Sequence, residues 1–405
     1  MSGKWPGGFV TKTAPTVVGP VDGEGGTASG IWTLDQAADY EKQGLWPKPL
    51  GPTFQLYVWG YNNQGALGTG NTTSYSNPVQ IGSLSTWKRM SAGGANGYTT
   101  LGVISGALYA WGYNGAGQLG LGDITSRSSP VQVGALTNWG QSETNSNISI
   151  ARKTDGTLWT WGANNYGQLG LGDTTNRSSP VQVGALTDWG YVNLMNGSCF
   201  AIKTDGTLWA WGYNLSGELG LGDTTNRSSP VQVGSLTTWS SIVGTFYSVL
   251  ALKTDSTLWS WGGNSLGQLG LGDTTDRSSP VQIGSDTNWA QISGGDNQVA
   301  AVRTTGTTWT WGQGTFGKLG LGDTTNRSSP SQVGALTNWS ISAAAGGNTY
   351  WIKTNGQLWT VGRNYNGSLG IGASVDISSP VQIGSGTYWA DVKGGSQSGR
   401  AFKTP

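Results

Sequence analysis

Residues 211–234 read WGYNLSGELGLGDTTNRSSPVQVG, and nearly the same stretch recurs along most of the chain. Fifty residues earlier the sequence is WGANNYGQLGLGDTTNRSSPVQVG (161–184), and fifty residues later it is WGGNSLGQLGLGDTTDRSSPVQIG (261–284). The opening Trp-Gly pair falls at 59, 111, 161, 211, 261 and 311, with Val-Gly in its place at 361. Seven tandem units of this length indicate a propeller or a solenoid.

Each unit contains four short runs that alternate as β-strands do. In one unit these runs are TLWTWG (157–162), PVQVG (180–184), a run from Trp189, and FAIKT (200–204). We expect Pro180 at a first strand position, because proline cannot donate to a β-ladder. Asp205-Gly206 then joins the fourth run to the next unit as a two-residue hairpin turn. Four strands per unit predict a propeller blade.

The tryptophans follow the repeat. Of 22 tryptophans, seven stand at the start of the third run and eleven more lie in the Leu-x-Trp-Gly runs. One buried tryptophan removes roughly 150–250 Å² from water. We therefore expect these eighteen side chains to form the packing between blades.

The two ends of the repeat array complement each other. The chain finishes AFKTP (401–405), which matches AIKTD (201–205), while the first unit starts with FQLYVWG (54–60), which matches the first run of the others. We expect the last blade to have three strands from the C-terminus and to take its fourth from residues near 55–59. Closure of this kind leaves no free blade edge. The expected fold is all-β, a seven-bladed β-propeller over residues 54–405 closed by an N-terminal strand.

Composition excludes several function classes. Lys plus Arg is 22 and Asp plus Glu is 21, a formal charge of +1, which offers no basic surface for nucleic acid. The sequence contains no run of 18 apolar residues, so we expect no membrane insertion, and no signal peptide is visible. The chain has no histidine, so it lacks a Ser-His-Asp or Cys-His pair and the usual zinc ligands. The single Cys199 is expected to be a small buried residue. We expect no enzymatic activity and no cofactor.

Three recurring features favour structural roles. GQLGLGD is predicted to form a turn, since no helix or Gly-Lys-Ser/Thr follows it as in a phosphate-binding loop. An Asp and an Arg four residues apart, such as Asp173 and Arg177, are expected to pair locally, because a calcium site would need several carboxylates. A recurring cation is interpreted as a solvated strand end, at Lys153, Lys203, Lys253, Arg303, Lys353 and Lys403.

The motif WGxNxxGQLGLGD…P followed by A[IL]KTDG resembles the regulator of chromosome condensation repeat family over about residues 54–405. The resemblance implies a seven-bladed propeller. Well-known members exchange guanine nucleotide on a small GTPase and bind chromatin, whereas others, some of them bacterial, only bind proteins. Family repeats commonly carry a histidine where this chain has Ser198, Ser248, Gln298 and Asn348. Their absence argues against guanine-nucleotide exchange.

Residues 1–53 stand outside the repeat. Their first part is rich in Gly, Pro and Thr and predicts an extended arm. Thr33 and Gln36 form a capping box, and Gly44 is a stop signal, so we expect one short helix at about 34–43. A helix of this length is marginal alone, which suggests that the arm becomes ordered by docking; the alternative is an undocked leader. The expected docking residues are Trp5, Phe9, Trp32, Leu34, Leu45 and Trp46.

The segment SGIWTLDQAADYEKQGLWP (29–47) resembles a short module of bacteriophage virion proteins, often tail-fibre or other particle-attached proteins. This second resemblance implies a structural protein of a phage particle, with the module near its attachment region.

Two zones vary among the otherwise similar units. One follows the third-run tryptophan and the other follows Trp-Gly. Apolar side chains at loop tips suggest a partner-binding face, and neutral drift in tolerant loops is the alternative. The tip residues are Tyr166, Leu215, Leu266, Phe316 and Tyr365.

Taken together, the sequence predicts a virion accessory protein, a tail appendage or a capsid decoration on the exterior of a phage particle. Residues 1–53 would bind other virion proteins, and the loops would bind a host surface protein, a glycan or a neighbouring subunit, in an oligomeric arrangement. A soluble protein-binding propeller of the inhibitor kind is the alternative, and an exchange factor or an enzyme on this ring ranks lower.

Overall fold

The computed structural model describes residues 54–82, 87–93, 98–145, 147–395 and 397–404. These residues belong to one compact unit that starts at Phe54. The arm, the helix at 34–43 and the six docking residues predicted above lie outside the described residues.

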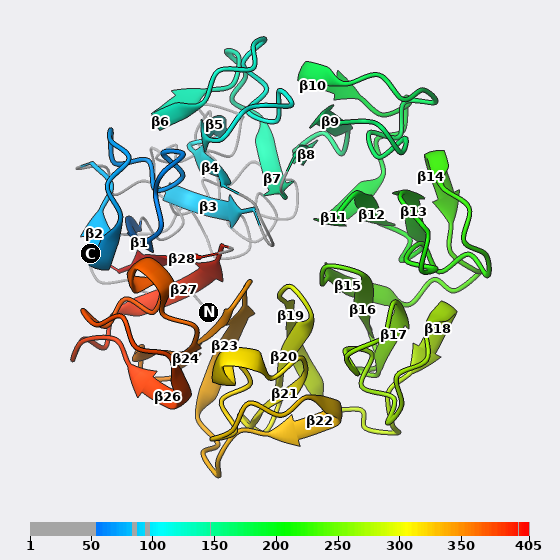
Figure 1. The fold of residues 1–405 in the computed structure, drawn as a ribbon. Coiled ribbons are helices and arrows are strands. Elements are labelled where there is room, and N and C mark those ends of the chain that lie inside the picture. Colours follow the sequence, from blue (N-terminus) through cyan, green and yellow to red (C-terminus); the bar gives the residue numbers. More distant parts are fainter. Residues whose placement is uncertain (1–53, 83–86, 94–97, 146, 396, 405) are drawn as a thin grey trace, which may run out of the picture. The chain divides into compact units, whose positions relative to one another are not determined.

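Seven four-stranded antiparallel sheets are arranged in a ring and form the blades of a propeller (Figure 1). The expected all-β, seven-bladed fold is confirmed. Blades 1 to 3 consist of β3 (Trp87–Ala92), β4 (Thr99–Ile104), β5 (Ala107–Gly112), β6 (Arg127–Gln132); β7 (Trp139–Thr144), β8 (Ile148–Lys153), β9 (Leu158–Gly162), β10 (Arg177–Gln182); and β11 (Trp189–Met195), β12 (Ser198–Lys203), β13 (Leu208–Gly212), β14 (Arg227–Gln232).

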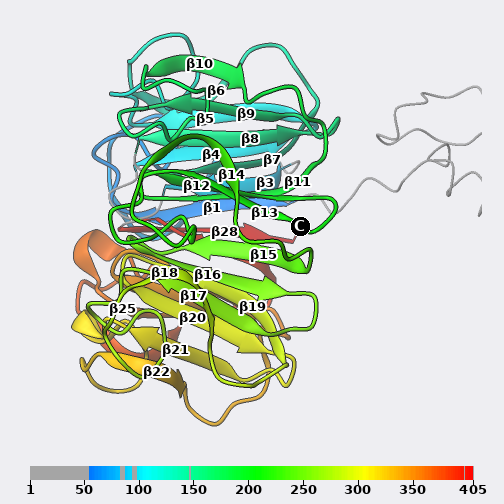
Figure 2. The same cartoon turned by 90° about the vertical axis from the view of Figure 1, so that its right-hand side faces the viewer.

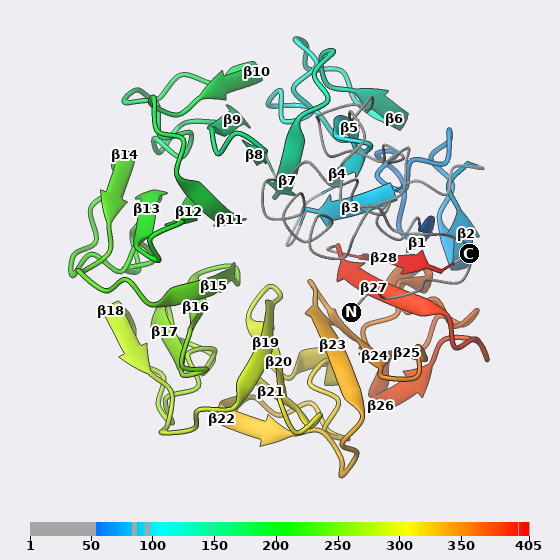
Figure 3. The same cartoon turned by 180° about the vertical axis from the view of Figure 1, so that it is seen from behind.

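Blades 4 to 6 repeat this order around the ring. They consist of β15 (Trp239–Gly244), β16 (Ser248–Lys253), β17 (Leu258–Gly262), β18 (Arg277–Gln282); β19 (Trp289–Gly294), β20 (Gln298–Arg303), β21 (Thr308–Gly312), β22 (Arg327–Gln332); and β23 (Trp339–Ala344), β24 (Asn348–Lys353), β25 (Leu358–Gly362), β26 (Ile377–Gln382). Short 3₁₀ turns lie at Thr315–Gly317 and Tyr365–Gly367. The tryptophan-led strand of each blade lies nearest the ring axis (Figures 1 and 3), and edge-on the strands run along that axis (Figure 2).

Blade 7 closes the ring with two strands from each end of the chain. Its order is β2-β1-β28-β27, in which β27 (Trp389–Gly394) and β28 (Ser398–Lys403) are C-terminal, and β1 (Gln55–Gly60) and β2 (Tyr75–Gln80) are N-terminal. The prediction of three C-terminal strands and one N-terminal strand is therefore wrong. The strand β26, which contains the run that begins at Pro380, is the outermost strand of blade 6.

Two local expectations are also corrected. Pro180 is the fourth residue of β10, and the pairing with β9 shifts between Arg177 and Val181. Because β10 is an edge strand with an irregularity there, it tolerates a residue without an N–H. The Asp205-Gly206 turn contains positive φ only at Gly206, at 80°, and Lys203 N–H donates to Thr207 O. This geometry fits a three-residue hairpin loop whose last residue is left-handed.

Thirteen of the eighteen recurrent tryptophans are buried and fill the space between blades as expected, whereas five are half-buried and stack on a tryptophan of their own blade: Trp159, Trp209, Trp259, Trp309 and Trp359. Trp211 is fully buried, and its indole N–H donates to Gln168 O of the preceding blade at 3.0 Å. The backbone of Gly170 packs so closely on the Trp211 ring that an added Cβ would meet Nε1 at 2.7 Å. The seven tryptophans that begin the inner strands are buried as well: Trp87, Trp139, Trp189, Trp239, Trp289, Trp339 and Trp389.

Blade 6 replaces one tryptophan with another from a neighbouring strand. Val361 stands where other blades have the tryptophan equivalent to Trp211. Trp351, on the adjacent strand β24, is fully buried and lies against Gly320, and its N–H donates to Thr308 Oγ1 at 2.9 Å. The volume between blades 5 and 6 is thus filled from a different backbone position.

The recurring cations are not simply solvated strand ends. The Lys153 ammonium lies 3.7 Å from the ring centroid of Trp159 and 5.1 Å from that of Trp139. Lys153 is only 6% exposed, and Lys353, stacked in the same way on two tryptophans, is 8% exposed. Attraction between a cation and the faces of the two indoles accounts for this burial.

Candidate protein-binding face

The two variable zones meet at one end of the ring. The loop between the first and second strands of a blade hydrogen-bonds to the loop between its third and fourth strands. In blade 3, Tyr213 N–H donates to Gly197 O at 2.9 Å, and in blade 4, Gly263 N–H donates to Tyr247 O at 2.8 Å. We call this end, formed by both sets of loops, the loop face.

A buried asparagine holds each long loop in shape. Asn164 is fully buried; its side-chain oxygen accepts from Leu169 N–H at 2.9 Å, and its amide donates to Asp173 O and Thr175 O. The same Asn stands at 62, 114, 214, 264 and 364, and Gly314 replaces it in blade 5. The repeated letters of these loops therefore encode a rigid scaffold for the variable tips.

The predicted Asp–Arg pairing is confirmed within this scaffold. Arg177 Nη2 lies 2.6 Å from Asp173 Oδ2, and the carboxylate also accepts from Thr175 N–H at 2.8 Å. These contacts, with that of the Thr175 N–H the largest, lower the pKa of the Asp173 carboxyl. The pair is part of the turn and draws in no second carboxylate.

The five predicted tip residues all lie on the loop face. Leu215 is 64% exposed, Tyr365 51%, Tyr166 46% and Phe316 40%, while Leu266 is half-buried. They do not occupy one equivalent position, because Leu215 and Tyr365 stand one residue earlier in their loops than the other three. Phe316 adopts a φ of 65°, which is uncommon for a bulky side chain and costs about 1–3 kcal/mol.

Aromatic side chains on this face contact each other between neighbouring blades. The rings of Tyr166 and Tyr213 are 5.0 Å apart, and those of Tyr61 and Tyr365 are 6.5 Å apart. The Arg363 guanidinium lies 4.8 Å from the Phe316 ring and 5.0 Å from that of Tyr365. The sequence analysis did not single out Tyr61, Tyr213 and Arg363, although each directly follows Trp-Gly or Val-Gly.

The opposite end of the ring also exposes apolar side chains, at a position that is leucine in four blades and Asp286 or Gly386 in two others. Leucines of the fourth-strand-to-next-blade loops are 44–50% exposed, at Leu136, Leu186, Leu236 and Leu336. The two ends therefore differ in their exposed apolar side chains, which are of several types at the loop tips and mostly leucine at the opposite end.

A model of the regulator of chromosome condensation (RCC1) repeat matches residues 55–97, 105–144, 155–192, 205–250, 255–302 and 305–350, more than half of the chain. The chain belongs to the RCC1 repeat family. Among solved structures, yeast RCC1 (Prp20) bound to Kap60 is 18% identical with a TM-score of 0.77, covering 87% of this chain and 89% of Prp20. Human WBSCR16 is 20% identical with a TM-score of 0.76, covering 87% of this chain and 99% of WBSCR16. At these identities the likeness concerns the fold.

Curated RCC1-repeat relatives match over short stretches. The human probable E3 ubiquitin-protein ligase HERC3 is 40% identical over 85 residues, which are 20% of this chain and 8% of the ligase. The Arabidopsis thaliana ultraviolet-B receptor UVR8 is 35% identical over 78 residues, 19% of this chain and 18% of the receptor. The matches thus span less than a fifth of these relatives.

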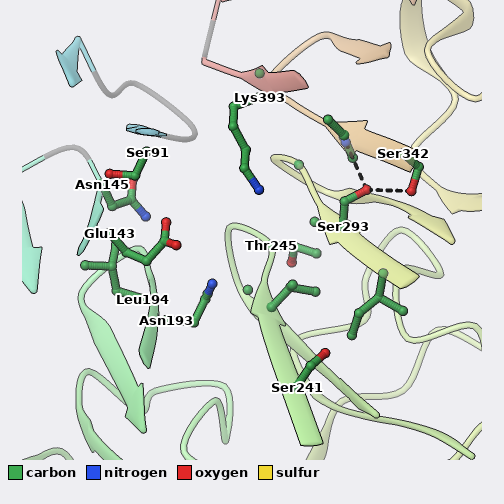
Figure 4. A pocket seen from close by; sticks show the side chains of 18 of the residues that line it. Ser91, Glu143, Asn145, Asn193, Leu194, Ser241, Thr245, Ser293, Ser342 and Lys393 are labelled. Atoms are coloured by element: carbon green, nitrogen blue, oxygen red, sulfur yellow. Dashed lines mark hydrogen bonds between the residues drawn. The ribbon is translucent and has the colours of Figure 1, made fainter. Parts of the chain in front are cut away.

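The inner strands of this RCC1-repeat ring line a central channel with a cavity of about 420 Å³ (Figure 4). Glu143 on β7 lies in it, and burial raises the pKa of its carboxyl to about 7, although Lys393, Gln141 and Arg89 act in the opposite direction. Burial and the Glu143 charge also raise the pKa of Tyr191 to about 12.

Replacing Glu143 by Gln should change how stability depends on pH. The carboxyl has a higher pKa folded than unfolded, so between about pH 4.5 and 7 the folded state holds more protons and loses stability as pH rises. We expect the free energy of unfolding to fall by about 1–3 kcal/mol more in the wild type than in Glu143→Gln across this window. Urea unfolding at pH 5 and pH 8 measures it, with the exposed Asp286→Asn as control; equal pH dependence in wild type and Glu143→Gln would contradict the assignment.

Other side chains singled out from the sequence lie in the core or in turns. Cys199 is buried, its Sγ lies 3.1 Å from Gln168 O, and burial raises the pKa of its thiol. In the described part of the chain, no three His, Cys, Asp or Glu side chains gather as a metal site would require. No helix within the described ranges is long and apolar enough to cross a membrane.

Proposed function

We propose that this RCC1-repeat protein is a protein-binding propeller and that its partner binds the loop face. One observation carries the proposal: the loop face gathers exposed aromatic and apolar side chains of several types, on loops whose framework is the same in nearly every blade. Such an arrangement separates the residues that hold the fold from those that are free to match a partner.

The chemistry of the loop face suits a protein partner. Tyr, Phe and Arg dominate the binding free energy of many protein interfaces, and the loop face presents Tyr166, Phe316, Arg363 and Tyr365 together with Leu215. The asparagine-centred loops hold the backbone around Tyr166, Leu215 and Tyr365 in one conformation, which limits the conformational entropy lost on binding. The yeast relative Prp20, which shares the fold, is known in a complex with the protein Kap60.

Changing Tyr166, Phe316 and Tyr365 together to Ser should abolish partner binding and leave the ring folded. Loss of three central aromatic contacts at about 1–2 kcal/mol or more each predicts a Kd at least about 100-fold weaker. Calorimetry with the partner identified by cross-linking from the loop face measures the change.

Leu136, Leu186 and Leu336, changed together to Ser, are the matched control, since they remove three exposed apolar side chains from the opposite end. Unchanged affinity in the loop-face variant, or equal loss in the control, would refute the assignment of the face.

We further propose that the propeller is an accessory protein on the exterior of a bacteriophage particle, attached through residues 1–53. Support comes from the sequence of residues 29–47, which resembles a module of virion proteins. This segment lies outside the RCC1-repeat match, which begins at residue 55. In this role the loop face would bind a host surface protein, a glycan or a neighbouring subunit. The inhibitor-like soluble propeller would bind its partner equally well without residues 1–53.

Immunogold labelling with antibody against residues 54–405 tests the particle assignment. We expect label on a tail or a capsid vertex of purified particles, and less of it when residues 1–53 are deleted from the phage gene. Unlabelled particles with the protein free in the lysate would favour the soluble protein-binding propeller.

A further inference from the structure

The central channel contains a polar cavity that protein binding at the loop face leaves unexplained. It measures about 420 Å³, within the range of small-molecule sites. Its wall is built from equivalent positions of the inner strands, which are Ser91, Glu143, Asn193, Val243, Ser293, Ala343 and Lys393. One ring position thus carries an acid in blade 2, a base in blade 7 and uncharged side chains in the other five blades.

Charge is confined to one side of this channel. Arg89 comes from β3, Glu143 from β7, and Asp391 and Lys393 from β27, and their charges act on one another. The strands β15, β19 and β23 contribute only neutral lining residues such as Ser241, Gln291 and Ser342. A ligand in the cavity would therefore meet charged groups on one side and small or amide side chains on the other.

Glu143 and Lys393 point toward the same space without closing it. Figure 4 shows the Glu143 carboxylate and the Lys393 ammonium directed into the cavity from β7 and β27, on the charged side of the channel. They act on each other through space, since Lys393 lowers the pKa of Glu143, but no ion pair within 4.0 Å joins them. An acid and a base separated in this way leave room for a molecule that bears both complementary charges.

A buried donor without a partner lies in the same wall. Ser91 is 1% exposed, and its hydroxyl makes no hydrogen bond with a described residue. An unsatisfied buried polar group costs about 1–3 kcal/mol, and an ordered water or ion is one way in which such a group is satisfied. This observation is independent of the charges on Glu143 and Lys393.

We propose that the channel binds a small zwitterion of the free amino acid type, with its ammonium on Glu143 and its carboxylate on Lys393. A simple anion would be attracted by Lys393 but repelled by Glu143 and Asp391, and a simple cation would meet Lys393 and Arg89. Only a molecule with both charges complements both Glu143 and Lys393.

Ligand-observed NMR with the full-length protein tests this proposal. The probes are the twenty free amino acids at millimolar concentration, each compared with its N-acetyl and its amide derivative, together with inorganic phosphate. We expect at least one free amino acid to bind, and both of its blocked forms to bind at least about 10-fold more weakly, since each loses one charge-assisted contact.

Glu143→Gln and Lys393→Met then assign the site. Glu143→Gln should weaken binding of the free amino acid about 10-fold and leave binding of its N-acetyl form unchanged. Lys393→Met should also weaken binding of the free amino acid about 10-fold and leave binding of its amide unchanged. Asp286→Asn, on the opposite end, is the control, and melting curves confirm that each variant folds. No binding by any amino acid, binding insensitive to both variants, or equal binding of phosphate and of the N-acetyl form would overturn the proposal.

Discussion

A chain that lacks residues 54–60 is expected not to form the ring. The segment contains β1, which pairs with β28 on one side and with β2 on the other, so its loss opens blade 7 in the middle. Leu56, Val58 and Trp59 are fully buried, and the Trp59 indole donates to Ser368 O of blade 6. Loss of three such side chains costs about 2–5 kcal/mol each, which together approaches or exceeds the usual 5–15 kcal/mol stability of a domain.

Circular dichroism and thermal unfolding of the deletion variant measure this loss. The control is a permuted chain in which residues 55–62 follow Thr404 through an Asp-Gly turn, as Thr207 follows Thr204-Asp205-Gly206 in blade 3. The permuted chain contains β1 at its C-terminal end instead of its N-terminal end, so we expect it to unfold cooperatively on heating. A deletion variant with the melting curve of the intact chain would show that blade 7 is not closed by β1.

Trp211→Ala should give a large loss of stability, as should substitution of the equivalent Trp161, Trp261 or Trp311. The side chain is fully buried, packs on Gly170 and donates to Gln168 O, so its removal leaves a cavity at the interface of blades 2 and 3. We expect the free energy of unfolding to fall by about 3–5 kcal/mol. Urea unfolding, analysed with a common slope, measures the change.

Trp209→Ala is the matched control on the same strand. Trp209 is half-buried, contacts the Lys203 ammonium at 4.6 Å and donates to Thr207 Oγ1. Its loss is expected to cost about 1–2 kcal/mol. If both substitutions cost the same, the fully buried tryptophan would not be the main contact between blades.

The repeat made much of the fold predictable, because few architectures combine a fixed period, four strand-like runs and recurrent tryptophans. The closure of blade 7 was predicted with the wrong division of strands, since the sequence does not show where one blade ends. Trp351 was not recognised as the substitute at Val361, because the compensation joins two strands that meet only in the folded sheet. The position of Lys153 between two indoles was missed for the same reason.

The candidate site was predictable only in part. Variation among repeats indicated that Tyr166 and Phe316 lie at loop tips. It did not show that both variable zones lie at the same end of the ring, because that placement depends on the direction of the strands. Tyr213 and Arg363 contact the tip residues Tyr166 and Phe316 of neighbouring blades, which are about fifty positions away in the sequence. The channel was not predicted at all, since Glu143 and Lys393 are far apart in sequence and approach each other only when the ring closes.

Photo-crosslinking tests the central claim most directly. A benzoylphenylalanine at Tyr166 on the loop face is compared with one at Leu186 on the opposite end, since both side chains are 46% exposed. In the cells or particles that contain the protein, we expect a discrete protein adduct from position 166 and none from position 186. Adducts from position 186 alone, or the same adducts from both positions, would contradict a protein-binding role for the loop face.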